Sequence, residues 1–163
     1  MSGSKTFFIP SILTFYMNLA DFLVEAKRRA YGSSTSEPKQ LDDGSKEYLI
    51  KIEEYTYRDR YFGSNPFVGE EVVFRDDKPV WSMNYYGKST SRDPDEVFSF
   101  LMRALQRVEK KKPYRGPEKY VEGLWHYSFL SRGNINSFWG EEEIQYDGIK
   151  VYGLRFHGGE IGA

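Results

Sequence analysis

The chain has no cysteine among its 163 residues and has only two histidines. The lack of cysteine excludes disulfide bonds, thiolate metal ligands and cysteine nucleophiles, and it fits a reducing compartment. Two histidines are too few for a histidine-rich metal site. We therefore expect neither a bound metal nor a cofactor.

The sequence also lacks a strong net charge and a long apolar run. The formal net charge is −1, so no overall field attracts nucleic acid or an anionic membrane. The apolar segment 7–20 is interrupted by Pro10 and continues into charged residues, whereas a membrane-spanning helix needs roughly 18 or more apolar residues. This segment also lacks the basic start and cleavage site of a signal peptide. We expect a soluble, cytoplasmic protein that does not contact membranes.

Aromatic residues, by contrast, make up 17% of a chain whose length suits one domain with a sizeable core. Two segments have helical periodicity. One follows a capping residue at Ser11 and ends at Gly32, and the other is capped by Asp93 and extends to Lys112. The polar segment 32–46 is expected to be a loop.

Alternation of aromatic and polar residues predicts strands between and after these helices. The segment 47–63 is expected to be one strand, and 67–86 a hairpin that turns at Asp76 and Asp77. The remaining predicted strands are 124–130, 138–146 and 150–156, the last two joined by the turn residues Asp147-Gly148. An alternative division starts with a strand at 6–9, which gives strand-helix-strand-strand units.

The segments 67–87 and 138–158 align without a gap at an offset of 71 residues, and each contains Gly-Glu-Glu. Seven of the 21 aligned positions are identical, against about one or two expected from ordinary residue usage. The order helix, strand, strand, strand also occurs twice. We infer an internal duplication with pseudo-repeats at about 11–88 and 93–159. The expected fold is α+β, with a largely antiparallel sheet and two helices packed on one face. The alternative is two unrelated hairpins with similar turns.

The hairpin turns suggest which side chains share a face of the sheet. With two-residue turns, Glu70 lies opposite Met83 and Glu141 lies opposite Leu154. Both carboxylates would then lie on an aromatic face. The predicted ligand-binding residues on that face are Glu70, Glu141, Trp81, Tyr85, Trp139 and Tyr152. Carboxylates among aromatic rings suit a cationic or amphipathic small molecule. Alternatively, both glutamates lie at strand ends and reach solvent.

The other face of the sheet is expected to carry polar side chains. The predicted polar clusters are Glu71 with Asn84 and Tyr86, and Glu142 with Arg155 and His157. A cross-strand ion pair between Glu142 and Arg155 is the structural interpretation. His157 is a candidate acid–base group, although no partnered nucleophile accompanies it.

Several segments resemble a bacterial domain of unknown function that often follows a helix-turn-helix in transcriptional regulators. They are FLVEAKR, DRYFG, FVGEEVVF, KPVWSMNYYG, RGPEKY and FWGEEEIQYDG, and the resemblance extends from about Leu13 to Gly159. It implies a ligand-sensing or interaction module and supplies no catalytic residues. Because few residues precede Leu13, we expect a stand-alone module without direct nucleic-acid contact.

Three functions remain open at this point. The favoured hypothesis is a small-molecule-binding or sensing module with an aromatic, glutamate-containing pocket. The second is a carboxylate-based enzyme of unknown substrate, which uses Glu71 or Glu142 with Asn84, Tyr86 or His157. The third is a structural interaction domain, whose exposed aromatic surface would bind a protein partner or form a homodimer.

Overall fold

The computed structural model describes residues 17–32 and 37–162. The predicted cap Ser11 and the alternative strand at 6–9 lie outside the described residues. The elements are α1 (Leu19–Gly32), β1 (Lys39–Gln40), β2 (Lys46–Ile52), β3 (Tyr55–Gly63), β4 (Phe67–Arg75), β5 (Lys78–Ser89), α2 (Pro94–Leu105), β6 (Lys119–Glu122), β7 (Trp125–Asn134), β8 (Ser137–Tyr146) and β9 (Ile149–Glu160). Neither described helix is long and apolar enough to cross a membrane.

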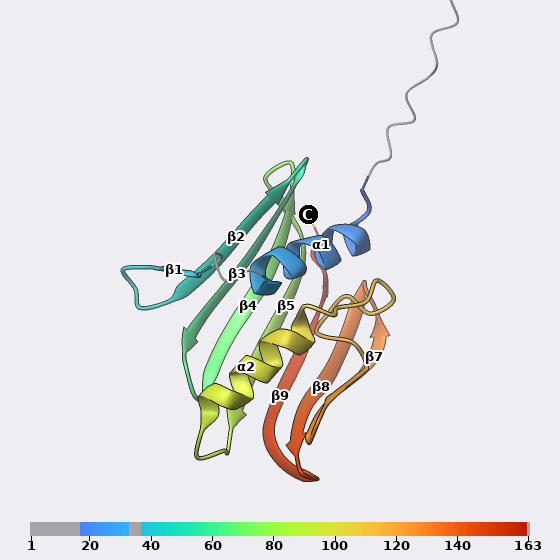
Figure 1. Cartoon of the computed structure of the whole chain (residues 1–163). Coiled ribbons are helices and arrows are strands. Elements are labelled where there is room, and N and C mark those ends of the chain that lie inside the picture. Colours follow the sequence, from blue (N-terminus) through green and yellow to red (C-terminus); the bar gives the residue numbers. More distant parts are fainter. Residues whose placement is uncertain (1–16, 33–36, 163) are drawn as a thin grey trace, which may run out of the picture.

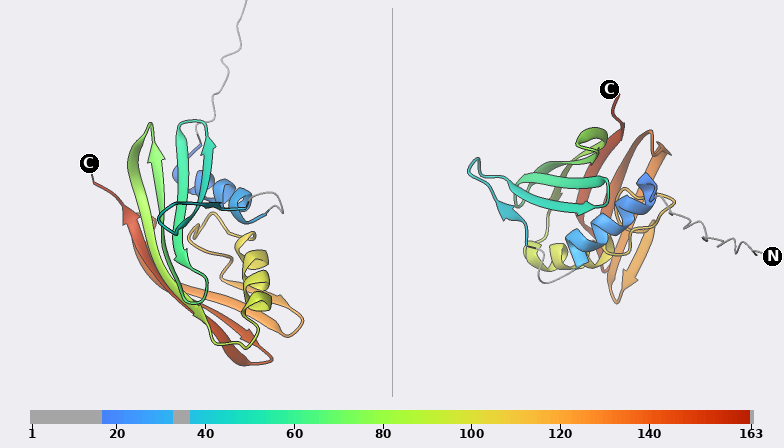
Figure 2. Two further views of the ribbon diagram at one scale, coloured as in Figure 1. Left: turned by 90° about the vertical axis from the view of Figure 1, so that its left-hand side faces the viewer. Right: turned by 90° about the horizontal axis from the view of Figure 1, so that it is seen from above.

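The described strands form one curved antiparallel sheet in the order β1-β2-β3-β4-β5-β9-β8-β7-β6. Both helices pack on its concave side (Figures 1 and 2). The predicted α+β class and antiparallel sheet are therefore confirmed. Because β5 pairs with β9 at the centre, the sheet has an N-terminal half (19–89) and a C-terminal half (94–160). In the N-terminal half α1 precedes the five strands β1 to β5, and in the C-terminal half α2 precedes the four strands β6 to β9.

Several elements differ from the sequence predictions. The short strand β1 lies within the predicted loop 32–46, β6 was not predicted, and β5, β7 and β9 extend beyond their predicted ends. The segment 47–63 is a hairpin of β2 and β3 rather than one strand, because Glu53 turns the chain with a φ of 52°. The second helix has the predicted cap, Asp93, but ends at Leu105 rather than Lys112. Val108 still joins the buried side of this region, as its periodicity predicted.

The predicted hairpin register is wrong by one residue in both hairpins. The β4–β5 register shifts between Val73 and Phe74, and the β8–β9 register shifts between Ile144 and Gln145. Each bulge inserts one residue near the turn, so every side chain beyond it changes its partner. Glu71 lies opposite Met83.

The glycine of each Gly-Glu-Glu sequence allows an aromatic ring to lie against the strand. A Cβ atom on Gly69 would overlap the ring of Tyr85, and one on Gly140 would overlap the ring of Phe156. Only glycine leaves room for such an approach. The second glutamate of each Gly-Glu-Glu sequence, Glu71 or Glu142, lies two residues after the glycine. Its side chain therefore points to the same concave side of the sheet.

Candidate functional site

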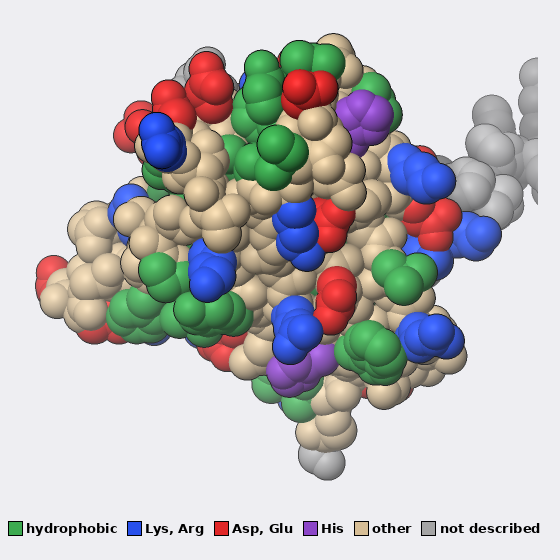
Figure 3. Space-filling model, turned by 90° about the horizontal axis from the view of Figure 1, so that it is seen from below, with side chains coloured by type: hydrophobic (Ala, Val, Ile, Leu, Met, Phe, Trp, Pro, Cys, Tyr) green, Lys and Arg blue, Asp and Glu red, His purple; other side chains and the backbone are tan. Residues whose placement is uncertain are grey.

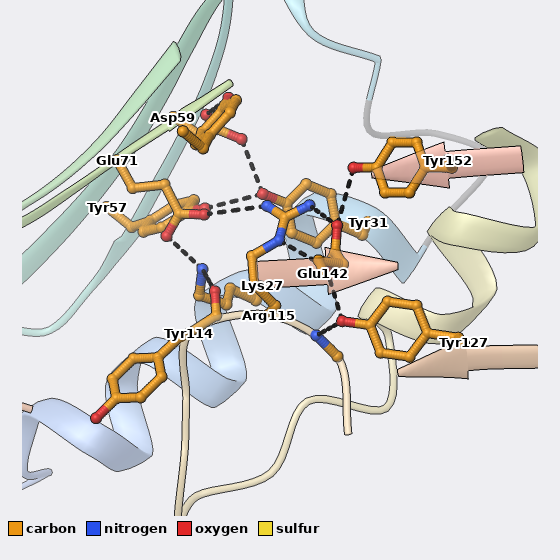
Figure 4. A network of polar contacts seen from close by, with 12 residues as sticks. Lys27, Tyr31, Tyr57, Asp59, Glu71, Tyr114, Arg115, Tyr127, Glu142 and Tyr152 are labelled. Carbon is orange, nitrogen blue, oxygen red and sulfur yellow. Dashed lines mark hydrogen bonds and ion pairs between the residues drawn. The ribbon is translucent and has the colours of Figure 1, made fainter. Parts of the chain in front are cut away.

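Five charged side chains are buried between the helices and the concave face of the sheet. They are Lys27, Asp59, Glu71, Arg115 and Glu142, and each is at most 4% exposed. They come from α1, β3, β4, the segment after α2 and β8, and Figure 4 shows them in one polar network with several tyrosines. Burying ionised groups is costly unless they are paired and hydrogen-bonded. The partners of each group therefore show where the network is complete and where it is not.

Glu142 is the fully paired carboxylate of the network. Arg115 donates to both of its oxygens, from Nε at 2.8 Å and from Nη2 at 2.9 Å. The hydroxyl groups of Tyr127 and Tyr152 donate to it at 2.7 and 2.9 Å. Tyr127 in turn accepts from the Gly116 backbone N–H at 2.9 Å. This bidentate arrangement uses the full acceptor capacity that a buried carboxylate needs.

Glu71 occupies the corresponding position of the N-terminal half and has fewer partners. Lys27 forms a buried ion pair with its Oε2 and also donates to the Tyr114 carbonyl at 2.9 Å. Oε1 of Glu71 accepts no hydrogen bond, and Arg115 Nη1 lies 4.0 Å away. Burial raises the pKa of the Glu71 carboxyl and lowers the pKa of Lys27.

Asp59 is a buried carboxylate without an ion pair in the described part of the chain. The Tyr85 hydroxyl donates to Oδ1 at 2.5 Å, and the Tyr31 hydroxyl donates to Oδ2 at 2.8 Å. Burial raises the pKa of Asp59, and the two tyrosine hydrogen bonds offset part of this increase. Tyr31 also shares a hydrogen bond of 3.1 Å with Tyr57, which extends the network along β3.

A pocket of about 250 Å³ extends from the surface to this carboxylate. Its exposed rim includes Lys46 and Ser64. Its apolar walls come from the sheet and from α2, and include Tyr48, Tyr61, Phe67, Phe98, Leu101 and Met102. Its buried end is lined by Asp59 and Arg115. An apolar pocket that ends at a few polar groups is the usual form of a small-molecule site.

The residues predicted from the sequence are divided between the two faces of the sheet. Glu70 and Glu141 do not lie on the aromatic face: they lie on the convex face, half exposed, in ion pairs with Arg58 at 3.2 Å and Arg155 at 3.1 Å. Trp139 is 54% exposed. The bulges cause this difference. Each one shifts the hairpin register by one residue, so the side chains of β4 and β8 that were predicted to point to the aromatic face point to the convex face instead.

The other predicted aromatic residues are buried, but they do not share one pocket. Tyr85 lines the pocket described above. Tyr152 belongs to the Glu142 centre. Trp81 stacks on Phe138 at 5.7 Å and donates to the Ile135 carbonyl at 3.0 Å.

The two predicted polar clusters are not assembled. Asn84 and Tyr86 are exposed on the convex face, whereas Glu71 is buried on the concave one. Glu142 is likewise separated from Arg155 and His157, and its ion pair is with Arg115 rather than Arg155. Seen from below, the surface interleaves acidic and basic side chains with separate apolar groups (Figure 3). Each of the two glutamates thus lies on the opposite face of the sheet from the residues with which it was predicted to act.

Sequence reasoning missed Lys27, Asp59 and Arg115. For Lys27 and Asp59, the sequence pattern does indicate a buried position. Lys27 lies among the buried positions of α1, which include Leu23, Ala26 and Ala30, and a lysine within an apolar stripe is unusual. Asp59 follows the alternation of inward residues in β3. Arg115 lies in an irregular segment, where no periodicity indicates its direction.

Comparison with known proteins places this network within a family. A model described as a domain of unknown function, DUF5680, matches residues 59–161. The match begins at Asp59 and includes Glu71, Arg115 and Glu142, whereas Lys27 precedes it. No curated protein and no solved structure matches the chain. Since the matched residues make up more than half of the sequence, the chain belongs to the DUF5680 family of domains.

Proposed function

We propose that the protein is a small-molecule-binding module, and that its ligand occupies the pocket between α2 and the N-terminal half of the sheet. The observation that carries this proposal is the buried end of the pocket, where Asp59 and Arg115 lie beyond mainly aromatic and aliphatic walls. A domain stabilised only by its core gains little from a charged group at the end of a cavity, because burial of that group is costly. Binding of a ligand to the Asp59 carboxylate would offset the cost of burying it.

The size of the pocket limits the ligand. Small-molecule sites usually measure ~300–1,000 Å³, so a volume of about 250 Å³ suits a small compound. Tyr48, Tyr61 and Phe98 provide flat apolar contacts on several sides. Sensing such a compound is the role that the resemblance to regulator-associated domains implies. Glu70, Glu141 and Trp139 are not needed for it.

The two halves of the sheet support a proposal about origin. The offset of 71 residues relates the two hairpins, their bulges after Val73 and Ile144, and the glycines that contact Tyr85 and Phe156. We infer that one helix-and-meander unit was duplicated. On this interpretation the N-terminal copy kept space for a ligand.

Native mass spectrometry of the freshly purified protein, compared with its denatured mass, tests the binding proposal. We expect an extra mass that is lost on denaturation. Met102→Trp places a large side chain into the pocket and should abolish the extra mass, because Met102 lines the cavity. Ser99→Trp, on an exposed position of the same helix, should retain it. Equal retention by both variants would contradict binding in this pocket.

A further inference from the structure

We propose that the pocket selects an organic cation, such as a protonated amine, which pairs with Asp59; this inference rests on the proposed function. The first step is the balance of buried charge. Among the described residues, the network contains the carboxylates of Asp59, Glu71 and Glu142 but only the cations Lys27 and Arg115. With every group ionised, the network lacks one positive charge.

The second step locates the missing charge. Arg115 gives two hydrogen bonds to Glu142, and Lys27 is engaged by Glu71 and the Tyr114 carbonyl. Neither cation forms an ion pair with Asp59 in the described part of the chain. Asp59 holds only neutral donors, Tyr31 and Tyr85, and each of its oxygens keeps acceptor capacity. The uncompensated carboxylate is therefore the one that lines the pocket.

The third step concerns the pocket walls. Tyr31, Tyr48, Tyr61, Phe67, Tyr85 and Phe98 all line the cavity. Rings around a carboxylate attract an ammonium group through their negative faces as well as through the charge. Arg115 is not a free anion site, since its Nε and Nη2 both donate to Glu142 and its guanidinium lies over the Tyr85 ring at 5.6 Å. Among the described residues, the exposed Lys46 at the rim is the only other cation of the lining.

Three probes of nearly equal shape test this selection: phenethylamine, 2-phenylethanol and phenylacetate, which carry a positive charge, no charge and a negative charge at neutral pH. Each is titrated into the full-length protein and followed by NMR chemical shifts. Fragments of this size bind with dissociation constants of about millimolar in favourable sites. We expect phenethylamine to bind at least tenfold more tightly than 2-phenylethanol, and phenylacetate to bind most weakly.

The variant Asp59→Asn isolates the carboxylate. We expect it to bind the amine and the alcohol about equally, while Glu70→Gln, the matched change on the convex face of the neighbouring strand, keeps the tenfold preference. If Asp59→Asn does not fold, Tyr48→Leu provides the second test, because removing one ring should weaken the amine more than the alcohol.

The outcomes separate the two proposals. Equal binding of the amine and the alcohol to the wild type, or tighter binding of phenylacetate, would overturn selection of a cation but leave a functioning pocket. If Asp59→Asn still preferred the amine, a group other than Asp59 would attract the cation, and the proposed pairing with Asp59 would be overturned. Absence of binding by all three probes would count against the proposed function itself.

Discussion

The two halves of the sheet place a glutamate at corresponding positions and surround it differently. Glu142 in the C-terminal half accepts four hydrogen bonds, two of them from Arg115. Glu71 in the N-terminal half has one hydrogen-bonded ion pair, with Lys27, and a longer one of 4.0 Å to Arg115, and its Oε1 accepts no hydrogen bond from the described residues. The pocket lies beside the less complete half, near Asp59. On the proposed function, the Glu142 centre stabilises the fold, whereas the N-terminal half keeps at Asp59 an uncompensated carboxylate for a ligand.

The largest expected effect follows from breaking the complete centre. Glu142→Gln removes the hydrogen-bonded counter-charge of the buried Arg115 and leaves it only the Glu71 carboxylate at 4.0 Å. Breaking one side of a buried pair typically costs about 3–5 kcal/mol. Urea unfolding followed by circular dichroism should show a loss in this range. The control Glu141→Gln removes a carboxylate that is half exposed on the other face, and should change the free energy of unfolding by less than about 1 kcal/mol. Similar losses for both variants would contradict the assigned role of Glu142.

The corresponding substitution in the Glu71 centre, Glu71→Gln, should lower the free energy of unfolding by a smaller amount. Glu71→Gln removes the ion pair of Lys27 but keeps an acceptor for it, and it makes the numbers of buried carboxylates and cations in the network equal. We expect a loss of about 1–2 kcal/mol, measured by the same unfolding experiment. A loss as large as that of Glu142→Gln would show that the two centres are equivalent, despite their different hydrogen bonding.

Much of the fold could be predicted from the sequence, because its signals are local. The cap Asp93, the apolar face of α2 and the turns at Asp76-Asp77 and Asp147-Gly148 depend on neighbouring residues. These signals gave the two helices and the β4–β5 and β8–β9 hairpins, but not the β2–β3 hairpin or the bulges. A bulge depends on how a strand fits its partners across the sheet, and one extra residue exchanges the two faces.

The site was less accessible to prediction for the same reason. The aromatic pocket was expected, and Tyr85 was placed in it, but the carboxylates were taken from the wrong face. Glu71 and Glu142 were identified as polar candidates, although their partners come from segments far away in the chain. Lys27 is 44 residues from Glu71, and Arg115 is 27 residues from Glu142. No sequence spacing links such pairs without the folded sheet.

We expect a smaller effect from the pH dependence that Asp59 gives to the free energy of unfolding. Its burial raises the pKa of the carboxyl above the unfolded value of about 4. The folded state therefore binds a proton more tightly, so the stabilisation is full below pH ~4 and is lost as pH rises through the folded pKa. The groups that face Asp59 are Tyr31, Tyr85, Lys27 and Arg115. Asp59→Asn removes this titration.

Urea unfolding at a series of pH values from about 4 upward checks this dependence. The stability of Asp59→Asn relative to the wild type should increase as pH rises from about 4 through the folded pKa of Asp59, because the wild type alone loses its contribution there. Glu70→Gln, whose carboxylate is half exposed, should keep a constant difference from the wild type. A constant difference for Asp59→Asn as well would mean that its carboxyl titrates in the folded protein as it does in the unfolded chain.

The smallest expected effect concerns the convex face, where the sequence alone placed the ligand-binding glutamates. The double variant Glu70→Gln and Glu141→Gln removes two exposed ion pairs, which typically contribute about 0–1 kcal/mol each. We expect it to fold with nearly unchanged stability and to bind phenethylamine as the wild type does, since neither residue lines the pocket. Urea unfolding measures the stability of the variant, and NMR titration measures its binding. If this variant lost binding but kept the spectrum of a folded protein, the ligand would bind at the convex face. The difference between the Glu71 and Glu142 centres would then have no role in binding.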